Sequence, residues 1–259
     1  MATIVIQGIC YDAKSSYLRG PAQAPTHIRK ALLSDATNSF AEDGTDISQL
    51  QIADQGDFTV TDYFDIEHRT TQHLASGQKL LSFGGDHSVT YPVVKALSAQ
   101  HPGLTLLHID AHADLYDVFE GDPYSHACPF ARIMEGGHAR RLVQVGIRTL
   151  NTHQRQQANK YGVEIIEMRH FEGATLPELK GPLYISIDLD GFDPAYAPGV
   201  SHHEPGGLSP RQVLALLQGI QAPVVGADVV ELNPMRDVQG ITAALAGKMA
   251  KELLALMGK

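Results

Sequence analysis

The chain has 259 residues, with 20 lysines and arginines against 29 aspartates and glutamates and a formal net charge of −9. This length fits one large α/β domain, and we expect residues 1–259 to form a single domain. The acidic balance argues against a nucleic-acid partner, since phosphate binding needs a basic face, and no run approaches the roughly 18 apolar residues that span a bilayer.

Hydrophobic periodicity predicts helices and strands that alternate along most of the chain. The N-terminal part is predicted to contain a strand over 3–9, a helix over about 26–33, a small strand over 51–53 and a helix over 62–76. The elements predicted after these are a strand at 79–83, a helix at 89–100, a strand at 104–109, a helix at 125–135, a strand at 141–147, a helix at 152–161, strands at 163–168 and 183–189, a helix at 210–220, a strand at 224–232 and a helix at 242–257.

This alternation predicts an α/β fold of three layers, α/β/α, around a mainly parallel sheet. The runs LYISI and VVGADVV are almost entirely apolar, as expected for strands that are buried on both faces. In such sheets, ligands bind at the carboxyl ends of the strands. Functional residues are therefore expected where the predicted strands end.

The cysteines and the N-terminal residues bear on the cellular compartment. Cys10 and Cys128 are the only two cysteines and are far apart, which argues against a disulfide scaffold and fits a reducing cytosol. The first residues, MATIVIQGICYDAKSS, resemble a first strand rather than a signal peptide. We expect a cytoplasmic protein that is not bound to a membrane.

The run LTLLHIDAHAD, residues 104–114, is the most informative stretch. It begins as a hydrophobic strand and then places Asp110, His112 and Asp114 at every second position, so that the three side chains project to one side. Acidic side chains are costly to bury unless they are neutralised. A divalent cation is the simplest way to neutralise them.

Three other predicted strands also end in polar residues. One runs into GGDHS, which contains His87, another into DLDGFDP, which contains Asp188 and Asp190, and the last into Glu231. The combined candidate ligands are four carboxylates and two imidazoles: His87, Asp110, His112, Asp114, Asp188 and Asp190. Oxygen-rich ligation with some nitrogen suits Mn²⁺, and six ligands fit a pair of ions better than one catalytic ion that keeps open positions. A pair can lower the pKa of a shared water enough for it to ionise near neutral pH.

Simpler explanations exist for each residue taken alone. A single His87 is more often a hydrogen-bonded histidine, and a single Asp188 or Asp190 more often caps a loop. They account poorly for a set that recurs at several strand ends. A dinuclear phosphoesterase also uses D-x-H, but the GNH[DE] motif expected later in such an enzyme is absent from this sequence.

The motifs GGDHS, DAHAD, SIDLDGFDP and EPGG resemble those of the ureohydrolase family, which includes arginases and agmatinases, and they occur in the family's order. The resemblance covers essentially the whole chain. Residues 114–144, EMR at 167–169, APGVSHHEPGGLS and VVGADVVELNP are similar to plant-type arginases in particular.

The resemblance implies an arginase-like α/β/α fold, two Mn²⁺ ions per subunit and hydrolysis of a guanidino group to urea. It implies that the six candidate ligands bind the metal and that Asp114 also stabilises the tetrahedral intermediate. His126, in YSHA, matches the family's proton-shuttle histidine, and Glu231 matches the acid that binds the guanidinium group. It also implies a homo-oligomer, a trimer or hexamer.

Among substrates we expect L-arginine, hydrolysed to L-ornithine and urea, with agmatine or another guanidino acid as the alternatives. A non-catalytic relative that binds metal or amines is the alternative from a different class. His202 and His203, in SHHEPGG, could contact the substrate but lack partners at ligand spacing. Tyr116, Asp117 and Glu120 lie on a loop that could contact the far end of the substrate or could simply be solvated. Cys128 is expected to be a small buried residue.

Overall fold

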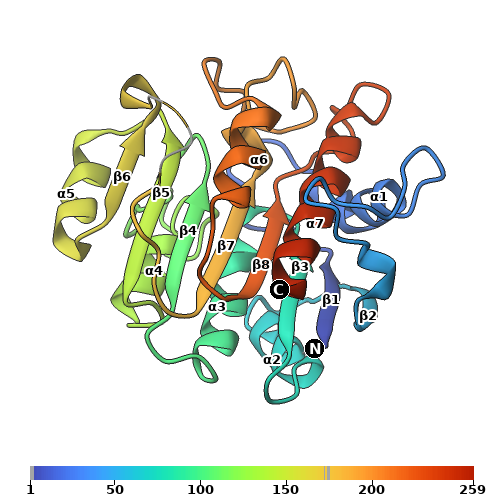
Figure 1. Ribbon diagram of the computed structural model, residues 1–259. Coiled ribbons are helices and arrows are strands. Elements are labelled where there is room, and N and C mark those ends of the chain that lie inside the picture. Colours follow the sequence, from blue (N-terminus) through green and yellow to red (C-terminus); the bar gives the residue numbers. More distant parts are fainter. Residues whose placement is uncertain (1–2, 172, 174–175) are drawn as a thin grey trace.

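The computed structural model describes residues 3–171, 173 and 176–259. Within these residues, eight strands form one sheet in the order β2-β1-β3-β8-β7-β4-β5-β6, and every neighbouring pair is parallel (Figure 1). Their bounds are β1 (Ile4–Ile9), β2 (Ile52–Phe58), β3 (Lys79–Phe83), β4 (Thr105–Ile109), β5 (Arg141–Ile147), β6 (Glu164–Glu167), β7 (Leu183–Asp188) and β8 (Val224–Val230).

Helices cover both faces of this sheet and make three layers (Figure 1). One face is covered by α1 (Ala24–Leu32), α6 (Pro210–Gln218) and α7 (Ile241–Gly258), and the other by α2 (Asp65–His73), α3 (Thr90–Ser98), α4 (Pro129–Glu135) and α5 (Thr152–Tyr161). Short 3₁₀ turns are η1 (Pro21–Gln23), η2 (Ile47–Gln49), η3 (His87–Val89), η4 (Met168–His170) and η5 (Leu189–Gly191). The predicted three-layer α/β fold is confirmed.

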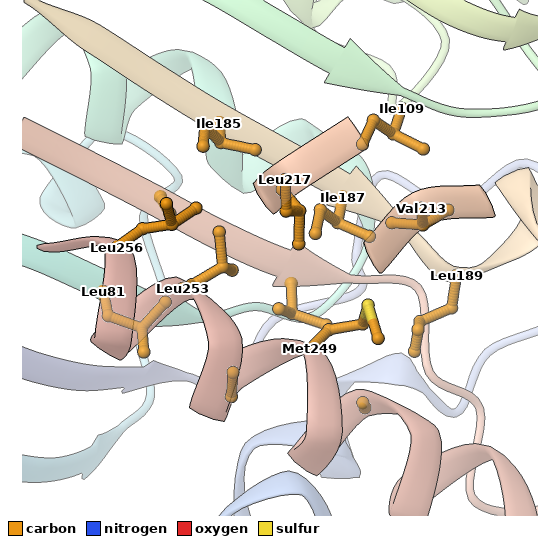
Figure 2. Close-up of a cluster of buried hydrophobic side chains, with 14 of the residues drawn as sticks. Leu81, Ile109, Ile185, Ile187, Leu189, Val213, Leu217, Met249, Leu253 and Leu256 are labelled. Atoms are coloured by element: carbon orange, nitrogen blue, oxygen red, sulfur yellow. The ribbon is translucent and has the colours of Figure 1, made fainter. Parts of the chain in front are cut away.

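The strands are apolar on both faces because each face packs against helices. Figure 2 shows one side of this core, where Met249, Leu253 and Leu256 of α7 lie against residues of the strands. Ile185 and Ile187 of β7 belong to the same cluster, and all five side chains are buried. Burying one such side chain fully stabilises the fold by about 1.5–3 kcal/mol, so the central strands form a rigid support for whatever their ends carry.

Several predicted elements differ in length from the observed ones, and the helix predicted over 62–76 spans only Asp65–His73. The small strand predicted at 51–53 is the longer β2, because its pairing with β1 shifts register after Asp54 and resumes at Asp57 and Phe58 instead of ending at Gly56. The helix predicted from residue 125 begins only at Pro129, whose ring has no backbone N–H to donate and therefore suits a first helical position. The residues before it, including His126, are consequently free to form a loop at the sheet edge.

Of the helices that the structure describes, none combines the length and the apolar character needed to cross a membrane.

Candidate metal centre and active site

The candidate residues meet at the carboxyl edge of the sheet, because parallel neighbouring strands end on the same side. His87 begins η3, the turn that follows β3 after residues 84–86, and Asp110 directly follows β4. Asp188 is the last residue of β7, and Asp190 lies in η5 next to it. In the strand order, β3, β8, β7 and β4 are consecutive. All six predicted ligands therefore lie in one region.

His87 is the centre of the first group. Its Nδ1 lies 3.1 Å from Asp110 Oδ2, 3.1 Å from Asp114 Oδ2 and 3.0 Å from Asp188 Oδ2. His87 and Asp110 are fully buried, yet Nδ1 makes no hydrogen bond within the described residues. A buried nitrogen that faces several carboxylate oxygens without a hydrogen bond fits a metal ligand, since a cation would satisfy all of these groups together.

A buried polar network fixes which nitrogen of His87 faces the acids. Ser186 Oγ donates to Asp228 Oδ1 at 2.6 Å, so this oxygen accepts from His87 Nε2, which is 2.9 Å away. Asp228 is also held by the hydroxyls of Thr90 at 2.8 Å and Tyr184 at 2.7 Å. With its proton on Nε2, a neutral His87 presents a lone pair at Nδ1, as metal ligation requires.

The second group lies beside the first and shares one residue with it. His112 Nδ1 is 3.1 Å from Asp190 Oδ2 and 3.4 Å from Asp110 Oδ1. Ligand atoms of Asp110, His112 and Asp190 lie close enough together to hold one ion, as do those of His87, His108, Asp110 and Asp114. The two oxygens of Asp110 thus face two adjacent places for a cation.

The crowding of acidic side chains raises the pKa of two of them. Burial, together with the neighbouring carboxylates of Asp190 and Asp110, raises the pKa of Asp188 well above its usual range. Burial, with a contribution from Asp110, raises the pKa of Asp190 to about 7 against the opposing effect of His112. Carboxylates in this state gain strongly from a cation that neutralises them. The buried His/Asp cluster is therefore able to bind metal.

His126 and Glu231 form a pair next to this cluster. His126 Nδ1 is 3.0 Å from Glu231 Oε1, and its Nε2 is 2.8 Å from the hydroxyl of Ser16. Burial lowers the pKa of His126, but the Glu231 carboxylate, with smaller contributions from Asp86 and Asp114, outweighs this effect and raises the pKa to about 9. Glu231 Oε1 also accepts the backbone N–H of His87 at 2.8 Å, which fixes the carboxylate relative to the first group.

The backbone is unusual at two of these positions. Asp114 and Glu231 have φ angles of 49° and 65° although neither is glycine. Such conformations are sparsely populated and cluster at functional sites. Gly85 has a related role, because a Cβ there would lie 1.6 Å from the carbonyl oxygen of Tyr11 while its own carbonyl accepts the Glu231 N–H at 2.9 Å.

A cavity of about 230 Å³ opens onto this region, and its walls include Ser16, His112, Asp114, His126, His202 and Glu231. The described side chains that line it include no lysine or arginine. Acids and imidazoles at its base thus suit a positively charged group of a substrate.

Of the remaining candidate residues, some line the cavity and others do not. His202 lines the cavity with its ring 5.2 Å from that of His126, and Tyr116 lines it as well. His203 is exposed, and Asp117 and Glu120 are not among the lining residues. Cys128 is buried and free, as expected, and burial raises the pKa of its thiol to about 12.

Three residues near the acids were not found from the sequence. His108 lies two residues before Asp110 and four before His112, so the alternation along the strand already places it on the same side as these ligands. Ser16 follows β1, whose carboxyl end lies at the same sheet edge. Arg148 follows β5 and donates from Nη2 to the carbonyl of Asp190 at 2.7 Å.

The comparisons with known proteins agree with this geometry. The model of the Arginase family matches residues 2–256. The chain belongs to the arginase family. It is 48% identical to "Arginase 1, mitochondrial" of Arabidopsis thaliana over 280 residues, which covers 100% of this chain and 82% of that protein. It is 39% identical to the N(1)-aminopropylagmatine ureohydrolase of Thermus thermophilus, with 90% and 83% covered.

Among solved structures, the arginase from Medicago truncatula has a TM-score of 0.91 at 44% identity, with 100% of this chain and 88% of that chain covered. The predicted membership of the ureohydrolases, with plant arginases as similar relatives, is confirmed, and arginase-family chains of this kind are metal-dependent hydrolases.

The expectation of a cytoplasmic location is contradicted by these names. The arginase-family relatives from Arabidopsis thaliana, Medicago truncatula and rice are named mitochondrial, or chloroplastic and mitochondrial. The expectation was wrong because a low cysteine count indicates only a reducing environment, and the cytosol is not the only such compartment. The composition of a folded chain does not identify its organelle.

Proposed function

We propose that this chain hydrolyses the guanidino group of L-arginine to give L-ornithine and urea, with two Mn²⁺ ions in each subunit. The observation that carries the proposal is the shared carboxylate of Asp110, which faces His87 Nδ1 through one oxygen and His112 Nδ1 through the other. The proposed ligands are His87, Asp110, His112, Asp114, Asp188 and Asp190. Identity to plant arginases supports arginine as the substrate.

When bound, such a pair of ions supplies a water of lowered pKa and polarises the groups that it contacts. The protein's own part begins with Glu231. Its carboxylate is buried and is held in one orientation by the backbone N–H of His87, so it can accept hydrogen bonds from a planar guanidinium group. A guanidinium group bound in this way would have its carbon next to the proposed metal ligands.

His126 and Asp114 act on the reacting group from the cavity wall. In the free protein His126 carries a proton that is stabilised by Glu231. When the substrate guanidinium pairs with Glu231, that stabilisation weakens, and His126 can give its proton to the leaving amine. Asp114 stabilises the positive character of the guanidino nitrogens as the carbon becomes tetrahedral.

Agmatine is the second candidate substrate. It lacks the α-carboxylate of arginine, and the described lining of the cavity offers no lysine or arginine to pair with such a carboxylate. The neutral groups of Ser16, Thr149 and Gln154 are the hydrogen-bonding partners available there instead. Both substrates present the same guanidino end to Glu231.

The test is urea release, with Mn²⁺ supplied, from L-arginine, agmatine and a guanidino acid that has no α-ammonium group. We expect the highest kcat/KM for L-arginine. A higher value for agmatine would make agmatine the substrate, and no urea from any of the three would refute the hydrolase and favour a metal- or amine-binding protein.

A variant pair tests the role of His126. His126→Ala should keep its Mn²⁺ and lose about 10²–10⁴-fold in turnover, the usual contribution of a general acid. His101→Ala is the matched control, because His101 lies in the turn that leads into the amino end of β4, at the opposite edge of the sheet. Unchanged turnover in His126→Ala would remove His126 from the mechanism.

We also propose that residues 1–259 form a single domain, a proposal supported by the one continuous sheet. We propose a homo-oligomer, a trimer or hexamer, on the family resemblance. Light scattering tests the latter, and a monomer at assay concentration would contradict it.

A further inference from the structure

His108 lies within β4, two residues before Asp110, and its side chain is fully buried. Its ring stacks on Phe130 of α4, with the ring centroids 3.8 Å apart and the planes at 27°. Nε2 of His108 is 2.7 Å from Asp110 Oδ2. A histidine in the middle of a hydrophobic strand therefore directs one nitrogen at the carboxylate that both candidate metal groups share.

Gln144 determines which nitrogen of His108 carries the proton. It is the register partner of His108 on β5, and its amide Nε2 lies 2.9 Å from His108 Nδ1. The same amide nitrogen donates to the carbonyl of Ala113 at 2.7 Å, which fixes the orientation of the amide. An amide nitrogen only donates, so His108 Nδ1 accepts. The single proton of the imidazole is therefore on Nε2 and points at Asp110.

This arrangement leaves one polar atom of the Gln144 side chain without a hydrogen bond. Gln144 is fully buried, and its Oε1 finds no hydrogen-bond partner among the described residues. Unsatisfied buried polar atoms are uncommon in native proteins and call for an explanation. Here both amide hydrogens are used to fix His108 and the backbone at Ala113.

The Asp110 carboxylate is consequently held from two sides. Its Oδ2 accepts from His108 Nε2, and its Oδ1 accepts from the backbone N–H of His112 at 2.6 Å. These two hydrogen bonds prevent rotation of the carboxylate. Each oxygen then keeps one lone pair directed toward its own imidazole, His87 for Oδ2 and His112 for Oδ1.

We propose that His108 and Gln144 are positioning residues of the metal centre: Gln144 fixes the tautomer of His108, and His108 fixes the Asp110 carboxylate so that two cations can share it. The inference rests on the proposed ligation of metal by Asp110. Groups that orient metal ligands in this way are typically worth 10–100-fold in metal affinity.

The experiment measures Mn²⁺ binding to the full-length metal-free protein, with free Mn²⁺ counted from its electron paramagnetic resonance signal. His108→Phe removes the donor but keeps an aromatic ring against Phe130, and we expect about 10–100-fold weaker binding. His108→Gln keeps a donor that can reach Asp110 and should recover part of the affinity. Gln144→Met removes the tautomer lock and should weaken binding by a smaller factor.

Gln7→Met is the matched control for Gln144→Met. Gln7 is a fully buried glutamine of β1 whose Nε2 donates to the hydroxyls of Thr70 and Ser82, both at 3.1 Å. Its Oε1 also pairs with His73 Nδ1 at 2.8 Å, so Gln7→Met loses three buried hydrogen bonds, one more than Gln144→Met, at a place that touches none of the acids. Thermal unfolding of each metal-free variant reports the purely structural cost, which should be at least as large for Gln7→Met as for Gln144→Met.

The outcomes separate this inference from the proposed metal site. Wild-type Mn²⁺ affinity in His108→Phe and Gln144→Met, or equal weakening in Gln7→Met, would overturn the positioning role. If His108→Phe does not fold, Gln144→Met, which keeps the imidazole, decides the question against Gln7→Met. Asp110→Asn should lose most Mn²⁺ binding, and unchanged binding there would mean that the proposed site itself is wrong.

Discussion

The pair formed by His126 and Glu231 makes the stability of the metal-free protein depend on pH. In the folded protein the pKa of His126 is raised from 6.5 to about 9, with burial opposing the rise and Glu231, followed by Asp86 and Asp114, causing it. Their side chains are 11% and 5% exposed, so solvent screens the pair only weakly. Multiplying the difference in pKa by the 1.36 kcal/mol that one pKa unit is worth gives about 3 kcal/mol.

The sign follows from the direction of the shift. Because the folded pKa lies above the unfolded value, the folded protein binds the proton more tightly. The stabilisation is therefore fully present below pH 6.5 and is lost as the pH rises through about 9. For a chain of this size, about 3 kcal/mol corresponds to about 6–12 °C in Tm.

The assay is a double-mutant cycle with His126→Asn and Glu231→Gln, followed by thermal unfolding of metal-free protein between pH 6 and pH 10. The cycle cancels the titration of other groups, which is common to all four proteins. We expect the coupling energy of the pair to fall across this range, and the total stabilisation that the wild-type protein loses relative to His126→Asn to be about 3 kcal/mol. A coupling energy that is constant, or that grows with pH, would mean that Glu231 does not stabilise the protonated imidazole of His126.

Three further predictions concern the surroundings of the site. Gly85→Ala should cost about 4 kcal/mol or more in the free energy of unfolding, because its Cβ would overlap the Tyr11 carbonyl. Gly44→Ala, at positive φ but in open space, should cost only about 1–3 kcal/mol, and equal costs in chemical denaturation would contradict this. Ser16→Ala should lower kcat by about tenfold, for the loss of one hydrogen bond to His126, with the Mn²⁺ content of the protein unchanged; a loss of metal instead would assign Ser16 a different role. Chelation should lower Tm, and Mn²⁺ at about 1,000 times its Kd should restore about 4 kcal/mol per site; a Tm insensitive to chelator would argue against a metal centre.

The sequence predicted those parts of the site that follow from strand geometry. Asp110, His112 and Asp114 alternate after a hydrophobic strand, and Asp188 and Asp190 do the same after another. The rule that parallel strands end at one edge is enough to bring them together. His126 was accessible only through the family resemblance, because the helix predicted over 125–135 included it without setting it apart, whereas in the structure it lies in the loop before α4.

The residues that the sequence did not reveal act through contacts between distant segments. Ser16 reaches His126 across 110 positions of sequence, and Gln144 reaches His108 from a neighbouring strand. His108 itself was read as part of a strand interior, although its parity matched that of the acids. The pattern of a single sequence shows on which face of a strand a side chain lies. It does not show which residue of another segment that side chain contacts.

Anomalous diffraction at the manganese edge, from crystals grown with Mn²⁺, would decide whether two manganese ions share the Asp110 carboxylate. We expect two peaks about 3.5–4 Å apart, one beside His87 and one beside His112, with Asp110 between them. A single peak, or peaks away from these imidazoles, would contradict this expectation.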